Sequence, residues 1–95
     1  MPLQSAVKLK KTRPCVIISP DEMNKYLQTV VIAPVTSSSK PYPTRVAVKQ
    51  TNTKGWIVLD QIRTVDRQRI IKILDTLTTE VVAAVKAVLK ETYVY

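Results

Sequence analysis

The sequence predicts a mainly β fold, a small and strongly curved antiparallel barrel with a C-terminal helix. Short runs of β-branched residues recur along the chain, separated by stretches rich in proline, serine and charged residues. Only the last part of the chain shows an apolar pattern with helical period. The length of 95 residues suits a single domain, so we expect one domain over residues 1–95.

The expected strands follow from the apolar runs, taken in chain order. The first is "PCVIIS" at 14–19, the second "QTVVIAPVT" at 28–36 and the third "TRVAVKQ" at 44–50. "WIVLDQI" at 56–62 and "IIKIL", which starts at Ile70, predict two more. Because proline cannot donate a ladder hydrogen bond, Pro34 in the second run indicates a sheet edge or a bulge.

The segments between these strands read as connections. "PDEMNKYL" at 20–27 begins with a proline and two acids, which is typical of the first turn of a short helix. "SSSKPYP" at 37–43 predicts a loop, and the charged "RTVDRQR" at 63–69 predicts a turn. "MPLQSAVKLKK" at the start shows no clear strand, although residues 5–10 alternate weakly.

The final helix has the clearest signal. Thr78 or Thr79 is the expected N-cap, and Glu80 lies in the first turn. The apolar positions of this segment form one stripe, made of Val81, Val82, Val85, Val88 and Leu89. A sheet of this size needs a helix to cover it, so we expect the stripe to pack against the sheet, with Lys86 and Lys90 facing outward.

The charge of the chain points to a polyanionic partner. Fifteen Lys and Arg residues stand against seven Asp and Glu residues, which gives a net charge of +8. An excess of this size in one small domain indicates nucleic acid first and an acidic protein second. The alternative is a charge that serves solubility alone.

The composition also excludes several kinds of chemistry. The chain has no histidine, one cysteine (Cys15) and one glycine (Gly55). It therefore lacks the usual general base, any zinc-ligand spacing and a phosphate-binding glycine loop, so we expect no metal and no cofactor. Neither a membrane span nor a signal peptide is recognisable, and the single Cys15 fits a reducing, cytoplasmic location.

Three motifs stand out together: "KTRP" at 11–14, "PVTSSSKPYP" at 34–43 and "GWIVLDQIRTVD" at 55–66. In the first motif, Arg13 precedes a proline at the start of a strand, which places a guanidinium at the rim of the sheet. In this order and spacing the motifs resemble the PemK/MazF family of toxin endoribonucleases. The resemblance covers the chain from about residue 10 to its C-terminus.

The resemblance implies a fold, an activity and partners. The fold would be an SH3-like barrel that forms a homodimer. The activity would be metal-independent cleavage of single-stranded RNA, with the 2′-hydroxyl attacking the adjacent phosphate. The toxin would be neutralised by a cognate acidic antitoxin.

The resemblance also implies that Arg13 and Thr36 are the catalytic pair. A forked guanidinium matches two phosphoryl oxygens, and Thr36 would hydrogen-bond to the phosphate or relay a proton. The predicted RNA-binding residues are Lys8, Lys11, Ser37, Lys40 and Tyr42. Of these, Lys40 would hold a phosphate and Tyr42 would stack on a base, as in single-strand binders, although a loop lysine is also an ordinary solvated residue.

Other motif residues have simpler interpretations. Trp56 is expected in the core or at a dimer face. Asp60, Gln61 and Arg63 follow a buried strand, where a structural ion pair or a strand-end hydrogen bond is the favoured account.

The chain departs from the family pattern in two places. Members usually open with a strand of Gly-Asp-Ile-Val type, which this chain lacks unless residues 5–10 replace it. Lys8 stands where the family carries an acid, five positions before the arginine. Two alternatives therefore stay open: a catalytically weak or inactive family member that binds RNA or an antitoxin, and a gyrase poison like CcdB.

Overall fold

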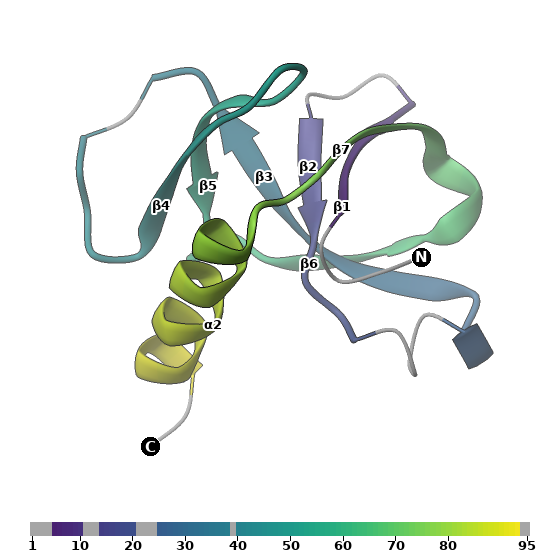
Figure 1. Ribbon diagram of the computed structural model, residues 1–95. Coiled ribbons are helices and arrows are strands. Elements are labelled where there is room, and N and C mark those ends of the chain that lie inside the picture. Colours follow the sequence, from purple (N-terminus) through teal and green to yellow (C-terminus); the bar gives the residue numbers. More distant parts are fainter. Residues whose placement is uncertain (1–4, 11–13, 21–24, 39, 94–95) are drawn as a thin grey trace.

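The computed structural model describes residues 5–10, 14–20, 25–38 and 40–93. Figure 1 shows a curved antiparallel sheet with one long helix at the C-terminus, which confirms the predicted fold class. The elements are β1 (Ser5–Leu9), β2 (Pro14–Ile17), β3 (Thr29–Thr36), β4 (Arg45–Lys49), β5 (Lys54–Val58), β6 (Arg63–Asp66), the 3₁₀ helix η1 (Arg67–Arg69), β7 (Ile70–Thr76) and α2 (Thr79–Tyr93).

The long strand β3 organises the sheet. The strand order is β4-β5-β3-β2-β1-β7, and β6 also pairs with β3. One edge of β3 pairs with β2; the other pairs with β6 over Thr29–Ile32 and with β5 at Val35 and Thr36. Pro34 lies between the β6 and β5 ladders. A residue that cannot donate a hydrogen bond is tolerated there, which accounts for a proline inside a strand of this length.

The sheet buries a core on each face. The first core lies under α2 and comprises Ala6, Val16, Ala33, Val35, Val46, Val48, Ile57, Leu59, Leu77, Val82 and Val85. The second core lies on the β6 side and comprises Val7, Leu9, Cys15, Ile17, Val30, Ile32 and Val65. Since β2 and β3 contribute to both cores, they are apolar on both faces, which explains their unbroken hydrophobic runs.

The helix α2 forms as its sequence predicts. The backbone N–H of Val81 donates to Thr78 Oγ1 at 3.3 Å, so Thr78 is the N-cap. Val82 and Val85 are buried in the first core, while Val81, Val88 and Leu89 are partly buried against it. At the other end of α2, the hydroxyl of Tyr93 donates to the Leu59 carbonyl at 2.6 Å. The Thr78 N–H also donates to Gln50 Oε1 at 3.1 Å, so both ends of the helix are tied to other segments of the fold.

One expectation about the elements is wrong, one open alternative is settled, and one prediction falls partly outside the described residues. Residues 5–10 do supply a strand, because Ser5–Leu9 pairs with both β2 and β7. Residues 63–69 are not simply a turn, because Arg63–Asp66 forms β6 and buries Val65. For the expected helical turn at 20–27, residues 21–24 lie outside the described part, and Lys25 and Tyr26 are helical. In the described part of the chain, no helix is long and apolar enough to cross a membrane.

Candidate functional site

Thr36 is the predicted site residue whose geometry is best defined. It is the last residue of β3, half-buried, and its backbone pairs with half-buried Trp56 on β5. Its hydroxyl donates to the Ser38 carbonyl at 3.1 Å and accepts from the Ser38 N–H at 3.4 Å. A hydroxyl that bonds to the backbone in this way fixes the first turn of the following loop. Exposed Ser37 lies within that turn.

The start of β5 lies directly against the backbone of Thr36. Gly55 has a φ of +140°, a region that residues with a side chain rarely adopt. A Cβ on Gly55 would collide with the Thr36 carbonyl group, whose carbon would lie 2.9 Å away. The single glycine of the chain is therefore required where β5 passes the end of β3.

Strand pairing brings the start of β2 beside the end of β3. Arg13 and Lys11 lie outside the described residues, but Arg13 immediately precedes Pro14, the first residue of β2. Cys15 pairs with Pro34 across the sheet. Along the chain this pair is two residues from Arg13 and two residues from Thr36, so the start of β2 adjoins the part of β3 that ends in Thr36.

The loop between β3 and β4 is anchored by a polar cluster. The Cζ atom of Arg45 lies 4.9 Å from the centre of the Tyr42 ring. Arg45 Nε lies 3.7 Å from Asp60 Oδ1, and Thr44 Oγ1 donates to the same oxygen at 3.1 Å. The structural ion pair expected for Asp60 is therefore confirmed. Because the guanidinium of Arg45 covers one face of the Tyr42 ring, a base can stack only on the other face.

The lysines predicted to bind RNA lie in different places. Lys40 is exposed in the loop, and its carbonyl accepts from the Tyr42 N–H at 2.8 Å. Lys8 is exposed on β1, paired with Pro14 on one side and Lys72 on the other. Strand alternation puts Lys8 on the same face as Ala6 of the first core, whereas Thr36 shares its face with Ile32 of the second core. Lys8 and Thr36 thus lie on opposite faces of the sheet.

Two further basic residues act electrostatically on Cys15 in β2. Burial raises the pKa of the Cys15 thiol, and the positive charges of Arg63 and Arg69 oppose that rise. Arg63 was assigned a structural role from sequence, and Arg69 was part of the predicted turn. The signal that could have found them is the charged run "RTVDRQR", whose folding as β6 and η1 brings it back to the sheet.

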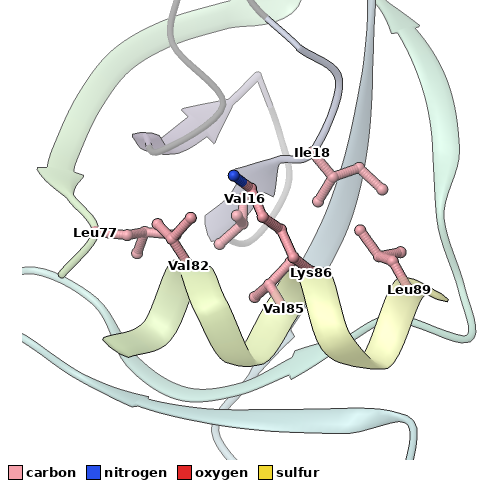
Figure 2. Close-up of a pocket in the computed structure, with 7 residues that line it drawn as sticks. All are labelled: Val16, Ile18, Leu77, Val82, Val85, Lys86 and Leu89. Atoms are coloured by element: carbon pink, nitrogen blue, oxygen red, sulfur yellow. The ribbon is translucent and has the colours of Figure 1, made fainter. Parts of the chain in front are cut away.

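An apolar hollow lies on the opposite side of the sheet from these arginines. It has a volume of about 80 Å³ and lies between α2 and β2. Figure 2 shows Lys86 reaching across it from α2 toward Val16. The other lining residues are Ile18, Leu77, Val82, Val85 and Leu89. The hollow belongs to the packing of α2 on the first core and does not adjoin Thr36.

The described residues also bear on metal chemistry. Among residues 5–10, 14–20, 25–38 and 40–93, no three side chains of the His, Cys, Asp or Glu types are grouped as metal ligands would be.

Comparison with known proteins gives consistent matches over most of the chain. Residues 1–93 match the family model of PemK-like, MazF-like toxins of type II toxin-antitoxin systems. The endoribonuclease MazF of Staphylococcus saprophyticus is 39% identical over 64 residues, which is 61% of this chain and 53% of that protein. The match therefore spans about half the length of that curated relative.

Solved structures agree on the fold. An endoribonuclease in complex with its cognate antitoxin, from a mycobacterial species, has a TM-score of 0.88 at 19% identity, covering 96% of this chain and 92% of that chain. MazF in a MazE–MazF complex from Deinococcus radiodurans has a TM-score of 0.84 at 28% identity, covering 96% and 93%. These matches confirm the expected barrel-like fold with its C-terminal helix.

Proposed function

The chain belongs to the PemK-like, MazF-like toxin family of type II toxin-antitoxin systems, and on that premise we propose that it is an endoribonuclease acting on single-stranded RNA without a metal. The observation that carries the proposal is the pairing of Cys15 with Pro34. It puts the start of β2, which Arg13 precedes in the chain, beside the segment that ends in Thr36, which supports a site drawn from both segments.

The proposed reaction is transfer of a phosphoryl group within the RNA. The 2′-hydroxyl oxygen forms a bond to the adjacent phosphorus, and the bond from phosphorus to the 5′-oxygen breaks. The proton of the 2′-hydroxyl leaves to solvent or through a side chain, and the 5′-oxygen takes up a proton. The products are a 2′,3′-cyclic phosphate and a 5′-hydroxyl end, and DNA, which lacks the 2′-hydroxyl, is not cleaved.

Arg13 is proposed to stabilise the transition state. The attack adds negative charge to the non-bridging phosphoryl oxygens, and a guanidinium donates to two such oxygens at once. A preorganised donor of this kind lowers the barrier by about 3 kcal/mol. This role comes from the family resemblance and from the position of Arg13 immediately before β2.

Thr36 is proposed to hydrogen-bond to the phosphate. A threonine hydroxyl is no strong base at neutral pH, so donation to a phosphoryl oxygen is the chemistry open to it. In the free chain its proton points to the Ser38 carbonyl. Binding of RNA must therefore exchange that hydrogen bond for one to the phosphate, which couples the loop after Thr36 to the substrate.

The proposed partners follow from charge and from the family. A cognate antitoxin with an acidic segment suits a chain whose net charge is +8, and that association should weaken as salt screens it. A homodimer is also proposed. Ile71 and Ile73, exposed at 52% and 55% on the terminal strand β7, leave apolar surface that a second protein chain could cover.

The second candidate function is binding of RNA or an antitoxin without cleavage, and the position of Lys8 favours it. Lys8 stands directly opposite Lys72, and two like charges facing each other across a strand pair suit an anionic ligand. The presence of β1 removes one argument for an inactive protein, because the edge of β2 is paired. Lys8→Glu tests this candidate: it should weaken RNA binding, and it should leave turnover unchanged because Lys8 lies on the opposite face of the sheet from Thr36.

The direct test is cleavage in excess chelator. We expect the chain to cut a long single-stranded RNA in the presence of EDTA, leaving 2′,3′-cyclic phosphate and 5′-hydroxyl ends. Arg13→Ala, purified in parallel, controls for contaminating nuclease. Cleavage that requires added Mg²⁺, or that leaves 3′-hydroxyl ends, would exclude the proposed mechanism.

A further inference from the structure

Trp56 lies beside Thr36 in the sheet and on the same face. The two residues pair across β3 and β5, and the next pair, Val35 with Ile57, is buried in the first core. Because side chains alternate along a strand, Thr36 and Trp56 point to the opposite face of the sheet, away from α2. Residues paired directly across antiparallel strands have Cβ atoms about 5 Å apart. The indole of Trp56 is therefore a neighbour of the hydroxyl at which RNA is proposed to bind.

The strand on the other side of Trp56 leaves the indole partly open. β5 lies between β3 and β4 (Figure 1), and the partner of Trp56 on β4 is Ala47. Ala47 is exposed and Trp56 is half-buried. A single methyl group is too small to cover an indole, so part of the ring is accessible on this face.

Two lysines continue the same face beyond Trp56. Lys49 and Lys54 pair directly opposite each other on β4 and β5, and both are exposed. Lys49 is two residues from Ala47, so strand alternation puts these two on one face, opposite to buried Val48. Like charges directly opposite each other destabilise a strand pair. An anion bound between the two ammonium groups would relieve that repulsion.

The lysine pair lies within reach of a short RNA segment bound at Thr36. Thr36, Trp56 and Ala47 form one row across three strands, and the lysines lie two residues further along β4 and β5. Strands are about 4.8 Å apart and rise about 3.4 Å per residue, which puts Lys54 about 8 Å and Lys49 about 12 Å from Thr36. Thr36, Trp56 and the lysine pair thus form a continuous path on one face of the sheet.

We propose that Trp56 stacks on one base of the RNA next to the phosphodiester being cleaved, and that Lys49 and Lys54 hold the adjoining phosphate. Proteins that bind single strands combine these two features, since bases stack on aromatic side chains while basic side chains follow the backbone. The inference rests on the proposed function and extends its site from the end of β3 across β5 to β4. Loss of these residues should weaken RNA binding and raise KM, while the cleavage rate at saturating enzyme changes little.

Trp56 is the only tryptophan of the chain, so its fluorescence reports directly on the proposed contact. The probe is an end-labelled 2′-O-methyl RNA of mixed sequence, which cannot be cleaved because its attacking hydroxyl is blocked, and anisotropy of the label follows binding. We expect unlabelled RNA of the same sequence to quench Trp56 emission saturably. Inorganic polyphosphate, which has no bases, should bind without quenching. RNA binding without a change in emission, or equal quenching by polyphosphate, would overturn the stacking contact.

Substitutions separate the stacking contact from the phosphate contact. Trp56→Leu should lower affinity for the probe by about 5-fold or more, and Trp56→Phe, which keeps an aromatic ring, should restore much of it. Lys49→Gln with Lys54→Gln should reduce the slope of log affinity against log salt by about 0.7, the contribution of one phosphate contact to a single strand. Lys90→Gln, an exposed site on α2, is the matched control and should leave the slope unchanged. A folded double variant with the wild-type slope would overturn the phosphate contact.

The outcomes also distinguish this inference from the proposed function. A wild-type chain that cleaves RNA but shows no quenching overturns the stacking surface alone. A chain that is quenched by the probe but cleaves no RNA supports the surface and excludes the endoribonuclease. Emission that changes with protein concentration and not with RNA would place Trp56 at a dimer face and overturn the inference. If Trp56→Leu fails to fold, quenching of the wild type and the lysine variants still decide the question.

Discussion

Two threonine hydroxyls in this protein differ in burial and in their hydrogen bonding. Thr36 satisfies its hydroxyl through the Ser38 backbone, at a strand end where RNA is proposed to bind. Thr53 is 1% exposed, and its Oγ1 has no hydrogen-bond partner among the described residues. A buried hydroxyl without a partner lowers stability, since its bonds to water are lost on folding and not replaced. The two threonines should therefore respond differently to the loss of their hydroxyls.

The first prediction concerns Thr53→Val. The substitution keeps the shape of the side chain and removes the unpaired hydroxyl, so the free energy of unfolding should rise by about 1 kcal/mol. Urea denaturation followed by circular dichroism measures the change. Exposed Thr51→Val is the matched control and should stay within about 0.5 kcal/mol of wild type. A clear loss of stability in Thr53→Val would show that the hydroxyl has a partner.

The second prediction concerns pH and Cys15. Burial raises the pKa of this thiol above its ordinary 9.0, so the folded chain keeps the thiol proton at a pH where the unfolded chain has lost it. Its contribution to stability is therefore complete below the ordinary pKa and is lost as pH rises through the raised one. Between about pH 8 and about pH 10.5, wild type should lose more unfolding free energy than Cys15→Ala, by urea denaturation. Equal losses in the two proteins would contradict the raised pKa.

At the scale of elements, β3 connects the fold to the site. It pairs with β2, β5 and β6, and the change of partner from β6 to β5 leaves room for Pro34 just before Thr36. Gly55 then allows β5 to approach the Thr36 carbonyl. The position of the Thr36 hydroxyl therefore depends on how β5 packs against β3 as well as on its own turn.

The third prediction is that Gly55→Ala damages both stability and activity. The new Cβ would meet the Thr36 carbonyl at a backbone conformation that alanine rarely adopts. The free energy of unfolding should fall by more than about 1 kcal/mol. RNA cleavage per folded molecule should fall as well, because relieving the collision displaces Thr36. Full stability together with full activity in this variant would contradict the close approach.

The sequence predicted those elements that bury several apolar residues, and missed those that bury few. The runs at 14–19, 28–36 and 44–50 form β2, β3 and β4, since each supplies repeated β-branched core residues. The strand β6 was missed because Val65 is its one buried residue, and β1 because it begins with the small residues Ser5 and Ala6. Only the pairing of these two strands with their neighbours identifies them.

The sequence could indicate the candidate site only where a local motif marks a residue. A threonine at a strand end is visible in the motif that contains Thr36, as is the arginine before Pro14. Which segments adjoin depends on the pairing of Cys15 with Pro34, which no local pattern reveals. Arg69 could not be singled out, because its approach to Cys15 depends on η1 packing against the end of β1.

For the whole molecule, the two faces of the sheet have different tasks. The face under α2 carries the larger of the two cores, and hydrogen bonds of Thr78 to Gln50 and of Tyr93 to Leu59 tie the two ends of the helix to other segments. The opposite face buries a smaller core, and strand alternation puts Thr36 on that face with Ile32.

The central claim is that the start of β2 and the end of β3 form one phosphoryl-transfer site in which Arg13 stabilises the transition state. The most direct measurement is the single-turnover rate of RNA cleavage in EDTA, at saturating concentrations of wild type, Arg13→Ala and Arg13→Lys. We predict a loss of about 100-fold or more for Arg13→Ala, and partial recovery for Arg13→Lys, which keeps the charge without the fork. A folded Arg13→Ala protein that cleaves at the wild-type rate would contradict the claim.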